Sequence, residues 1–218
     1  MSVVYNNDKH STFPSTQNRR VFFIGIHILK HQAETPSLQK LADTFYVSKS
    51  TISGDLSFLK DIAKASGNLK LASKKTGGIS ISGTEPALRH FFSSLVMLFY
   101  DIDNSYIKRA VMETFGAVYT ATPLHDILIR GLAGQGILLS DAKMSMLTFQ
   151  ILFSTYRFQN GHEIGIVKND LQHKPKWFSD IEQCLNVHYS SNEVNYIVSQ
   201  MLAIQGIHHE DKQLRQAQ

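Results

Sequence analysis

Residues 41–59, LADTFYVSKSTISGDLSFL, constrain the fold of this chain more than any other segment. Leu38, Leu41 and Ala42 recur at helical spacing, which predicts a short helix with one apolar face. After a polar run at residues 48–51, a second apolar stripe has the spacing of one helix face: Ile52, Leu56, Leu59 and Ala63. The segment therefore predicts the second and third helices of a helix-turn-helix.

The polar face of the later helix carries short hydroxyls and lysines. Ser48 is well placed to cap this helix, because its hydroxyl can accept a hydrogen bond from a first-turn amide. Such a face suits contacts to phosphates and base edges in the major groove of DNA. The candidate DNA-binding residues on it are Lys49, Ser50, Thr51, Ser53, Gly54, Ser57 and Lys60. The alternative interpretation is a surface helix pair with a solvated polar face.

The flanking segments favour the DNA-binding interpretation. Residues 20–29 are apolar enough for a buried first helix, which we expect to stop near residues 31–34. Residues 69–72 and 79–81 alternate like strands, and a basic, glycine-containing turn separates them. Three helices followed by a small hairpin form a winged helix. Lys74 and Lys75 would lie at the tip of its wing and contact the phosphate backbone.

The positive charge of the chain is concentrated in the same region. Residues 18–84 contain 10 Lys and Arg against 4 Asp and Glu, whereas residues 85–218 contain 11 against 13. All of the excess positive charge therefore lies in the predicted DNA-binding part, as neutralisation of phosphates requires.

The motifs VSKSTISGDL and GGISISGTEPALR carry a more specific resemblance. The segment from about residue 18 to 89 resembles the Mga-type winged helix of bacterial regulators in the BglG/LicR/MtlR group. Gly54 departs from that pattern, because this group often has a polar or basic residue there. A glycine in mid-helix costs about 1 kcal/mol relative to alanine. It either lets the backbone approach DNA closely or marks a degraded recognition helix.

Residues 85–218 are predicted to form an all-α bundle. Pro86 suits the first position of a linker helix at 86–101, which is strongly apolar. Asp141 and Ser191 can cap two of the helices that follow. Those helices are expected at 104–119, 123–133, 141–160, 175–186 and 191–206. The predicted organisation is a polar leader at 1–17, taken as flexible, a winged helix at 18–84 and the bundle at 85–218.

The bundle resembles a PTS regulation domain (PRD), a dimeric five-helix module that phosphocarriers phosphorylate on histidines. Residues 148–164 contain Arg157 and Gly161 of one motif of that family, and residues 192–206 contain Glu193 of another. The resemblance places the two regulatory histidines at Gln150 and Gln200. Glutamine has no nucleophilic imidazole, so we expect neither position to accept phosphate. The domain would keep the architecture as a dimerisation or docking module.

Several other groupings have structural explanations that outweigh catalytic ones. Neighbouring residues on a helix do not share a face, so the run at 208–210 (His-His-Glu) is interpreted as a solvated tail rather than a metal site. His125 and Asp126 are adjacent in sequence, which does not orient them as a dyad. Cys184 is interpreted as core packing, and the glycine-rich residues 131–136 as a turn between helices. We predict no catalytic residue, no metal and no cofactor.

Composition limits the remaining classes of protein. A single cysteine excludes an internal disulfide framework and fits a reducing cytosol. No apolar run reaches the length of a membrane span, and the first 17 residues lack the apolar core of a signal peptide. The expectation is a cytoplasmic protein that does not insert into membranes. Members of the resembled group often have further domains, so the chain is interpreted as a fragment or a truncated member.

The leading hypothesis is a bacterial transcription regulator of sugar-uptake or carbohydrate-utilisation genes. It would bind double-stranded DNA as a homodimer, with phosphotransferase-system proteins as further partners. The alternative is a protein–protein interaction module with a degenerate winged helix. RNA antitermination ranks third, because no strand-rich RNA-binding segment precedes the winged helix, and an enzyme ranks last.

Overall fold

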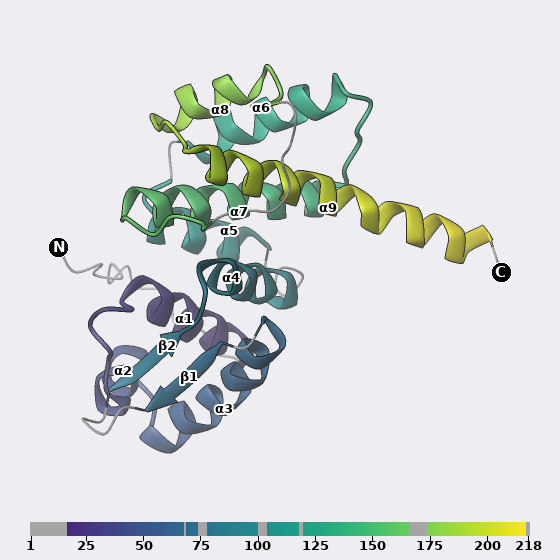
Figure 1. Ribbon diagram of the computed structural model, residues 1–218. Helices are drawn as coiled ribbons and strands as arrows, with labels where there is room; N and C mark the ends of the chain where they lie inside the picture. Colours follow the sequence, from purple (N-terminus) through teal and green to yellow (C-terminus); the bar gives the residue numbers. More distant parts are fainter. Residues whose placement is uncertain are drawn as a thin grey trace. The chain divides into compact units, whose positions relative to one another are not determined.

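The computed structural model describes residues 17–67, 69–73, 78–99, 104–117, 120–165 and 174–216, and for 99, 104–107 and 205–216 only the course of the helix. The chain divides into two compact units, residues 1–107 and 108–218 (Figure 1). Each unit is described by itself. The predicted polar leader lies outside the described residues, apart from Gln17, which begins the first helix.

The first unit is a winged helix with one additional helix. Its elements in chain order are α1 (Gln17–Lys30), α2 (Leu38–Phe45), α3 (Lys49–Ala65), β1 (Lys70–Ser73), β2 (Ile79–Ser82) and α4 (Glu85–Phe99). Helix α1 packs against α3 and α4, and α2 packs against α3. The predicted three helices and hairpin are confirmed, and so is the overall class of a mainly helical protein with a small hairpin.

The turn between α2 and α3 has well-defined end signals. Tyr46 ends α2 in the left-handed conformation, with φ 52° and ψ 45°, and its amide donates to the carbonyl oxygen of Ala42. Ser48 caps α3, since its hydroxyl accepts a hydrogen bond of 3.1 Å from the amide of Thr51. The predicted cap at Ser48 is confirmed.

The wing is a two-stranded antiparallel hairpin in which Lys70 pairs with Ser82 and Ser73 pairs with Ile79. A bridge between Ser37 and Gly78 joins the turn end of the hairpin to the start of α2. The tip, with the predicted wing residues Lys74 and Lys75, lies outside the described residues. The hairpin is therefore held in register by the helix-turn-helix as well as by its own strand pair.

Helix α4 belongs to the first unit, where it packs on α1. At Gly25 of α1 an added Cβ would come within 2.6 Å of Leu95 Cδ1 on α4, so the Leu95 side chain would have to move to admit a larger residue there. The predicted domain boundary at 84/85 is therefore earlier than the division that the structure makes after residue 107. The predicted start at Pro86 is also one residue late, since α4 begins at Glu85 and Thr84 Oγ1 accepts from the amide of Ala87.

In the residues that the structure describes, the second unit is all-helical. Its helices are the end of α5 (Asn104–Thr114), then α6 (Ala121–Ala133), α7 (Asp141–Gln159), α8 (Phe178–Leu185) and α9 (Ser191–Gln216). Helix α7 packs against α6 and α9, and α6 also packs against α8. Three predicted helix boundaries are wrong by three residues or more. Helix α5 ends five residues earlier than expected, before Gly116 at φ 68°. Helix α8 begins three residues later than expected, and α9 continues past residue 206 through the His-His-Glu run.

Two predicted caps in this unit are also corrected. Helix α7 is capped by Ser140, whose hydroxyl accepts from the amide of Lys143, while Asp141 is the first helical residue. At α9 the hydroxyl of Ser190 accepts from the amide of Glu193, and Ser191 is already in the helix. In both places two possible capping residues are adjacent, and the backbone uses the earlier one.

Candidate nucleic-acid interface

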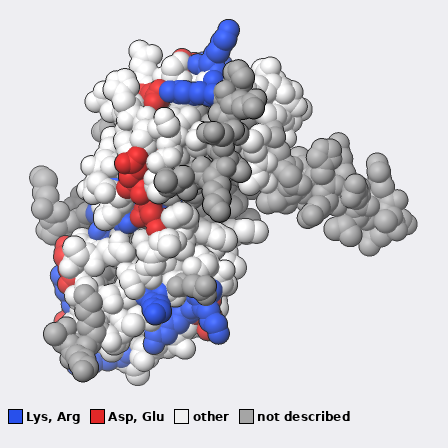
Figure 2. Space-filling model, viewed as in Figure 1, with Lys and Arg blue, Asp and Glu red and all other residues white. Residues whose placement is uncertain are grey.

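Helix α3 presents an exposed polar stripe. Exposed residues recur along one face of α3 at close to helical spacing: Lys49, Ser53, Ser57, Lys60 and Lys64. The opposite face is buried, with Ile52 and Leu59 fully enclosed. Figure 2 shows Lys and Arg side chains gathered on the first unit, over the region of α3 and β1. This distribution separates a basic, solvent-facing surface from the side that holds the helix in place.

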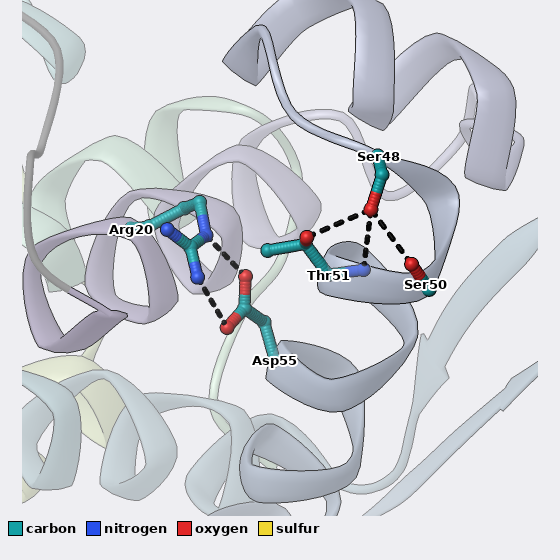
Figure 3. A network of polar contacts seen from close by, with 5 residues as sticks. All are labelled: Arg20, Ser48, Ser50, Thr51 and Asp55. Atoms are coloured by element: carbon teal, nitrogen blue, oxygen red, sulfur yellow. Dashed lines mark hydrogen bonds and ion pairs between the residues drawn. The ribbon is translucent and has the colours of Figure 1, made fainter.

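The first turn of α3 is organised by Ser48 (Figure 3). Its hydroxyl oxygen lies 2.7 Å from Ser50 Oγ and 2.8 Å from Thr51 Oγ1, in addition to its bond with the amide of Thr51. Thr51 is half-buried, whereas Ser50 is exposed. Both predicted contact residues therefore take part in the cap, and Lys49 and Ser53 are the more openly presented groups of this turn.

A buried ion pair fixes the orientation of α3 relative to α1. Arg20 on α1 donates two hydrogen bonds to Asp55 on α3, at 2.5 Å from Nε to Oδ2 and 3.0 Å from Nη2 to Oδ1 (Figure 3). The Asp55 side chain is 1 % exposed and that of Arg20 is 14 % exposed. A two-pronged guanidinium–carboxylate pair restricts rotation as well as distance. Asp55 therefore acts in positioning the exposed face rather than in contacting DNA.

Asp55 was not among the functional residues predicted from the sequence. Its position gave a usable signal, since an acidic residue beside Leu56 falls on the inward side of a helix whose stripe is otherwise apolar. A charged residue on a buried stripe needs a partner of opposite charge. Tyr46 and Lys64 were also missed, and both are exposed, Tyr46 at the turn before α3 and Lys64 at its last turn.

Gly54 is exposed and has no packing role in the first unit. A Cβ added there would meet no heavy atom within 4 Å. Because the helix itself does not require a glycine, we expect Gly54→Ala to raise the free energy of unfolding of this unit by about 1 kcal/mol. Thermal and denaturant unfolding would measure the change. Lower or unchanged stability would mean that the backbone at residue 54 is not held in a regular helix.

The same variant distinguishes the two interpretations of Gly54 for DNA binding. If the backbone approaches DNA closely, the added methyl group should weaken binding while the protein becomes more stable. If the helix has lost specific DNA recognition, the stability of the protein should rise and its affinity for DNA should stay the same. Ser179→Ala, at an exposed position of the second unit, is the control and should leave the DNA affinity unchanged.

A second conspicuous residue of the first unit is His27 on α1. Its ring lies 4.5 Å from that of His31 and meets Phe45 of α2 edge-on at 6.1 Å. Its Nε2 is buried and has no hydrogen-bond partner among the described residues. Burial, followed by the charges of His31 and Lys40, lowers the pKa of His27 from 6.5 to about 4. The ring is therefore neutral at physiological pH and acts as part of the α1–α2 packing.

In the second unit, the positions expected to have carried regulatory histidines are half-buried. Gln150 lies on α7 and Gln200 on α9, two helices that pack together. The neighbouring motif residues are interior: Arg157 is 2 % exposed and Glu193 is fully buried. Glu193 Oε1 accepts a hydrogen bond of 2.8 Å from the amide of Ile164, which joins α9 to the segment after α7. These motif residues therefore stabilise the bundle.

The remaining groupings do not form a reactive centre in the described part of the chain. Burial raises the pKa of the Cys184 thiol, which makes the thiolate scarcer. Within the glycine-rich segment, Gly131 lies inside α6 under the ring of Trp177, and Gly136 has φ 74° in the turn that follows. Among the described residues, no three potential metal ligands come together. Nor does any helix searched there have the length and apolarity needed to cross a membrane.

Comparison with known families identifies the class of the first unit. Residues 16–82 match the family model described as bacterial purine repressor, N-terminal. The matched segment covers α1 to β2, which is the winged helix with its exposed basic face. The chain thus carries a DNA-binding domain of a kind found in bacterial transcription regulators. No curated protein matches the chain significantly.

Proposed function

We propose that this chain is a cytoplasmic bacterial transcription regulator that binds duplex DNA through the exposed face of α3 and through the wing. The observation that carries the proposal is the match of residues 16–82 to a repressor DNA-binding domain, combined with the exposed lysine stripe on α3. The second unit supplies assembly and regulation. No catalytic step is assigned to the chain.

The set of controlled genes has two candidates. The resemblance of the second unit to a PRD favours genes of sugar uptake and carbohydrate utilisation. The name of the matched family, bacterial purine repressor, favours genes connected with purines. Sequencing the genomic fragments that the purified protein retains would separate them. Enrichment upstream of transport and sugar-metabolism genes supports the first, and enrichment upstream of purine genes supports the second.

The alternative function is an interaction module that has lost specific DNA binding. Three large apolar side chains of the second unit are exposed and favour a protein partner: Ile129, Leu138 and Leu202. Docking on a phosphotransferase-system protein would use such a surface. Fluorescence anisotropy with DNA from upstream of the protein's own gene separates the two functions. Binding no tighter than to random DNA of equal length would favour the interaction module.

Lys49→Ala is expected to weaken binding to every DNA sequence and to reduce the slope of log affinity against log salt by about one unit. Lys49 is exposed at the N-terminal end of α3, where it can neutralise one phosphate. Anisotropy titrations at several salt concentrations would measure both quantities. Lys176→Ala, an exposed lysine of the second unit, is the control and should change neither. An unchanged slope for Lys49→Ala would remove this residue from the interface.

We further propose that the protein acts as a homodimer, because a single winged helix neutralises few phosphates and such proteins commonly bind paired half-sites. Sedimentation at micromolar concentration should give twice the mass of the chain. A monomer both with and without DNA would contradict the proposal. With glutamine at positions 150 and 200, we infer that phosphocarriers do not control this dimer by modifying those positions.

A further inference from the structure

A cavity of about 200 Å³ lies within the second unit. Three helices supply its walls: α5 provides Lys108 and Met112, α6 provides Thr122 and His125, and α7 provides Ser145 and Thr148. Since a water molecule occupies about 30 Å³ in the liquid, this volume suits a molecule or group of only several non-hydrogen atoms. The cavity is separate from the predicted regulatory positions Gln150 and Gln200, which do not line it.

The hydrogen bonds at the cavity wall fix the roles of the His125 ring. Thr148 Oγ1 donates its only proton to the carbonyl oxygen of Met144, at 2.8 Å. The same oxygen lies 3.2 Å from His125 Nδ1, so it must accept there and Nδ1 must carry a hydrogen. Nε2 is therefore the ring nitrogen left for a ligand. Thr148 positions this ring.

Ser145 adds a hydroxyl to the wall of the cavity. The residue is 4 % exposed and lines the cavity. A buried serine in a helix often bonds back to a carbonyl one turn earlier, as Thr148 does. The Ser145 hydroxyl has no such bond and no other side-chain partner among the described residues. Its oxygen is not among the enclosed side-chain atoms that lack a partner, so it opens to the cavity, where it can donate to a ligand oxygen.

The chemistry of the walls favours an oxyanion. Lys108 brings a positive charge, and Thr122 and Ser145 bring hydroxyls, while no carboxylate is among the described lining residues. Thr122 also belongs to the first turn of α6, where the helix has no side-chain cap and its dipole favours negative charge. Donors that come from three helices suit a tetrahedral anion, which presents oxygens in several directions.

We propose that this cavity binds the phosphoryl group of a small metabolite. Ser145, Thr122 and Lys108 hold its oxygens, and His125 Nε2 accepts a hydrogen bond from its protonated oxygen. At neutral pH a phosphate monoester is near its second ionisation, so part of it carries that proton. A carboxylate offers fewer oxygens and carries no proton to share at this pH. Through this site, a small molecule would regulate the second unit by binding to it non-covalently.

The test uses the full chain and inorganic phosphate, followed by NMR of the backbone amides and histidine rings without DNA. Phosphate should cause saturable shifts at His125 and Ser145 and none at the exposed His188. Ser145→Ala should weaken binding about tenfold, the loss typical of a hydrogen bond to a charged group. Ser191→Ala, at the exposed start of α9, is the matched control and should leave the affinity unchanged.

Three results would overturn the proposal. One is a shift at His125 that does not saturate, or that Ser145→Ala leaves unchanged. Another is acetate binding at the same residues as tightly as phosphate, which would replace the phosphoryl group with a carboxylate. If Ser145→Ala does not fold, Thr122→Ala at the exposed edge of the cavity tests the same site. The third result is a phosphate affinity that Thr122→Ala leaves unchanged. None of these results bears on DNA binding by the first unit.

Discussion

Asp55→Ala is expected to lower the free energy of unfolding of the first unit by about 3 kcal/mol, the low end for loss of one partner of a buried ion pair. Asp55 is 1 % exposed and holds Arg20 with two hydrogen bonds. Its removal leaves a guanidinium that is mostly enclosed and has lost its carboxylate. Because Arg20 is partly exposed, water can solvate it in part, and we do not expect a larger loss.

Native-state hydrogen exchange of the α1 and α3 amides is the appropriate measurement, since it reports on this unit separately from the second one. Asp61→Ala is the matched control, because Asp61 is an exposed acidic residue of the same helix. It should change stability by less than about 0.5 kcal/mol. Equal protection of α3 in both variants would show that the ion pair does not orient this helix.

The stability of the first unit is expected to fall by about 2 kcal/mol between pH 7.5 and pH 4, largely because of His27. The pKa of His27 is lowered to about 4 in the folded chain, against 6.5 when unfolded. Between these values the unfolded state binds the extra proton. The stabilisation is therefore complete above pH 6.5 and is lost as the pH falls toward 4. The figure is discounted because the ring is only half-buried.

His27→Leu should flatten this pH dependence and should not reduce stability at pH 7.5, because it removes a buried nitrogen that has no hydrogen-bond partner. The groups that surround the ring also titrate or carry charge: His31, Glu34, Lys40 and Lys30. His90→Gln, at an exposed histidine of α4, is the control and should leave the slope unchanged. A slope that survives in His27→Leu would assign the dependence to Glu34, whose pKa is lowered by hydrogen bonds from His31 and Lys40.

The sequence predicted the recognition helix well because its signals are local. The stripe through Ile52 and Leu59 follows the helical period, and a serine before the first turn can cap it without help from distant residues. Strand alternation on either side of a glycine-containing turn is equally local, and it predicted the hairpin. Helix starts were harder to predict where two adjacent residues could both cap the helix, as Ser140 and Asp141 could at the start of α7.

Tertiary contacts determine whether the charged residues of the two motifs are exposed or buried. Asp55 and Arg89 occur in the two motifs that suggested DNA binding, yet both are buried. Arg89 donates to Glu85 at 2.9 Å, and Asp55 binds Arg20 from a helix 35 residues away in the chain. A sequence motif shows where a charged residue lies in the chain. It does not show whether the side chain is solvated by water or paired with an opposite charge. Only packing decides between a contact residue and a positioning residue.

By itself, the sequence determined the order and type of the elements, the turn before α3 and the polar face of that helix, because propensity, capping and periodicity act within a few residues. The tertiary structure alone decided that α4 packs on α1, where Leu95 lies close to Gly25. It also decided that Ser145, Thr148 and His125 meet around a cavity. These contacts join residues far apart in the chain, and their geometry is set by how whole helices pack.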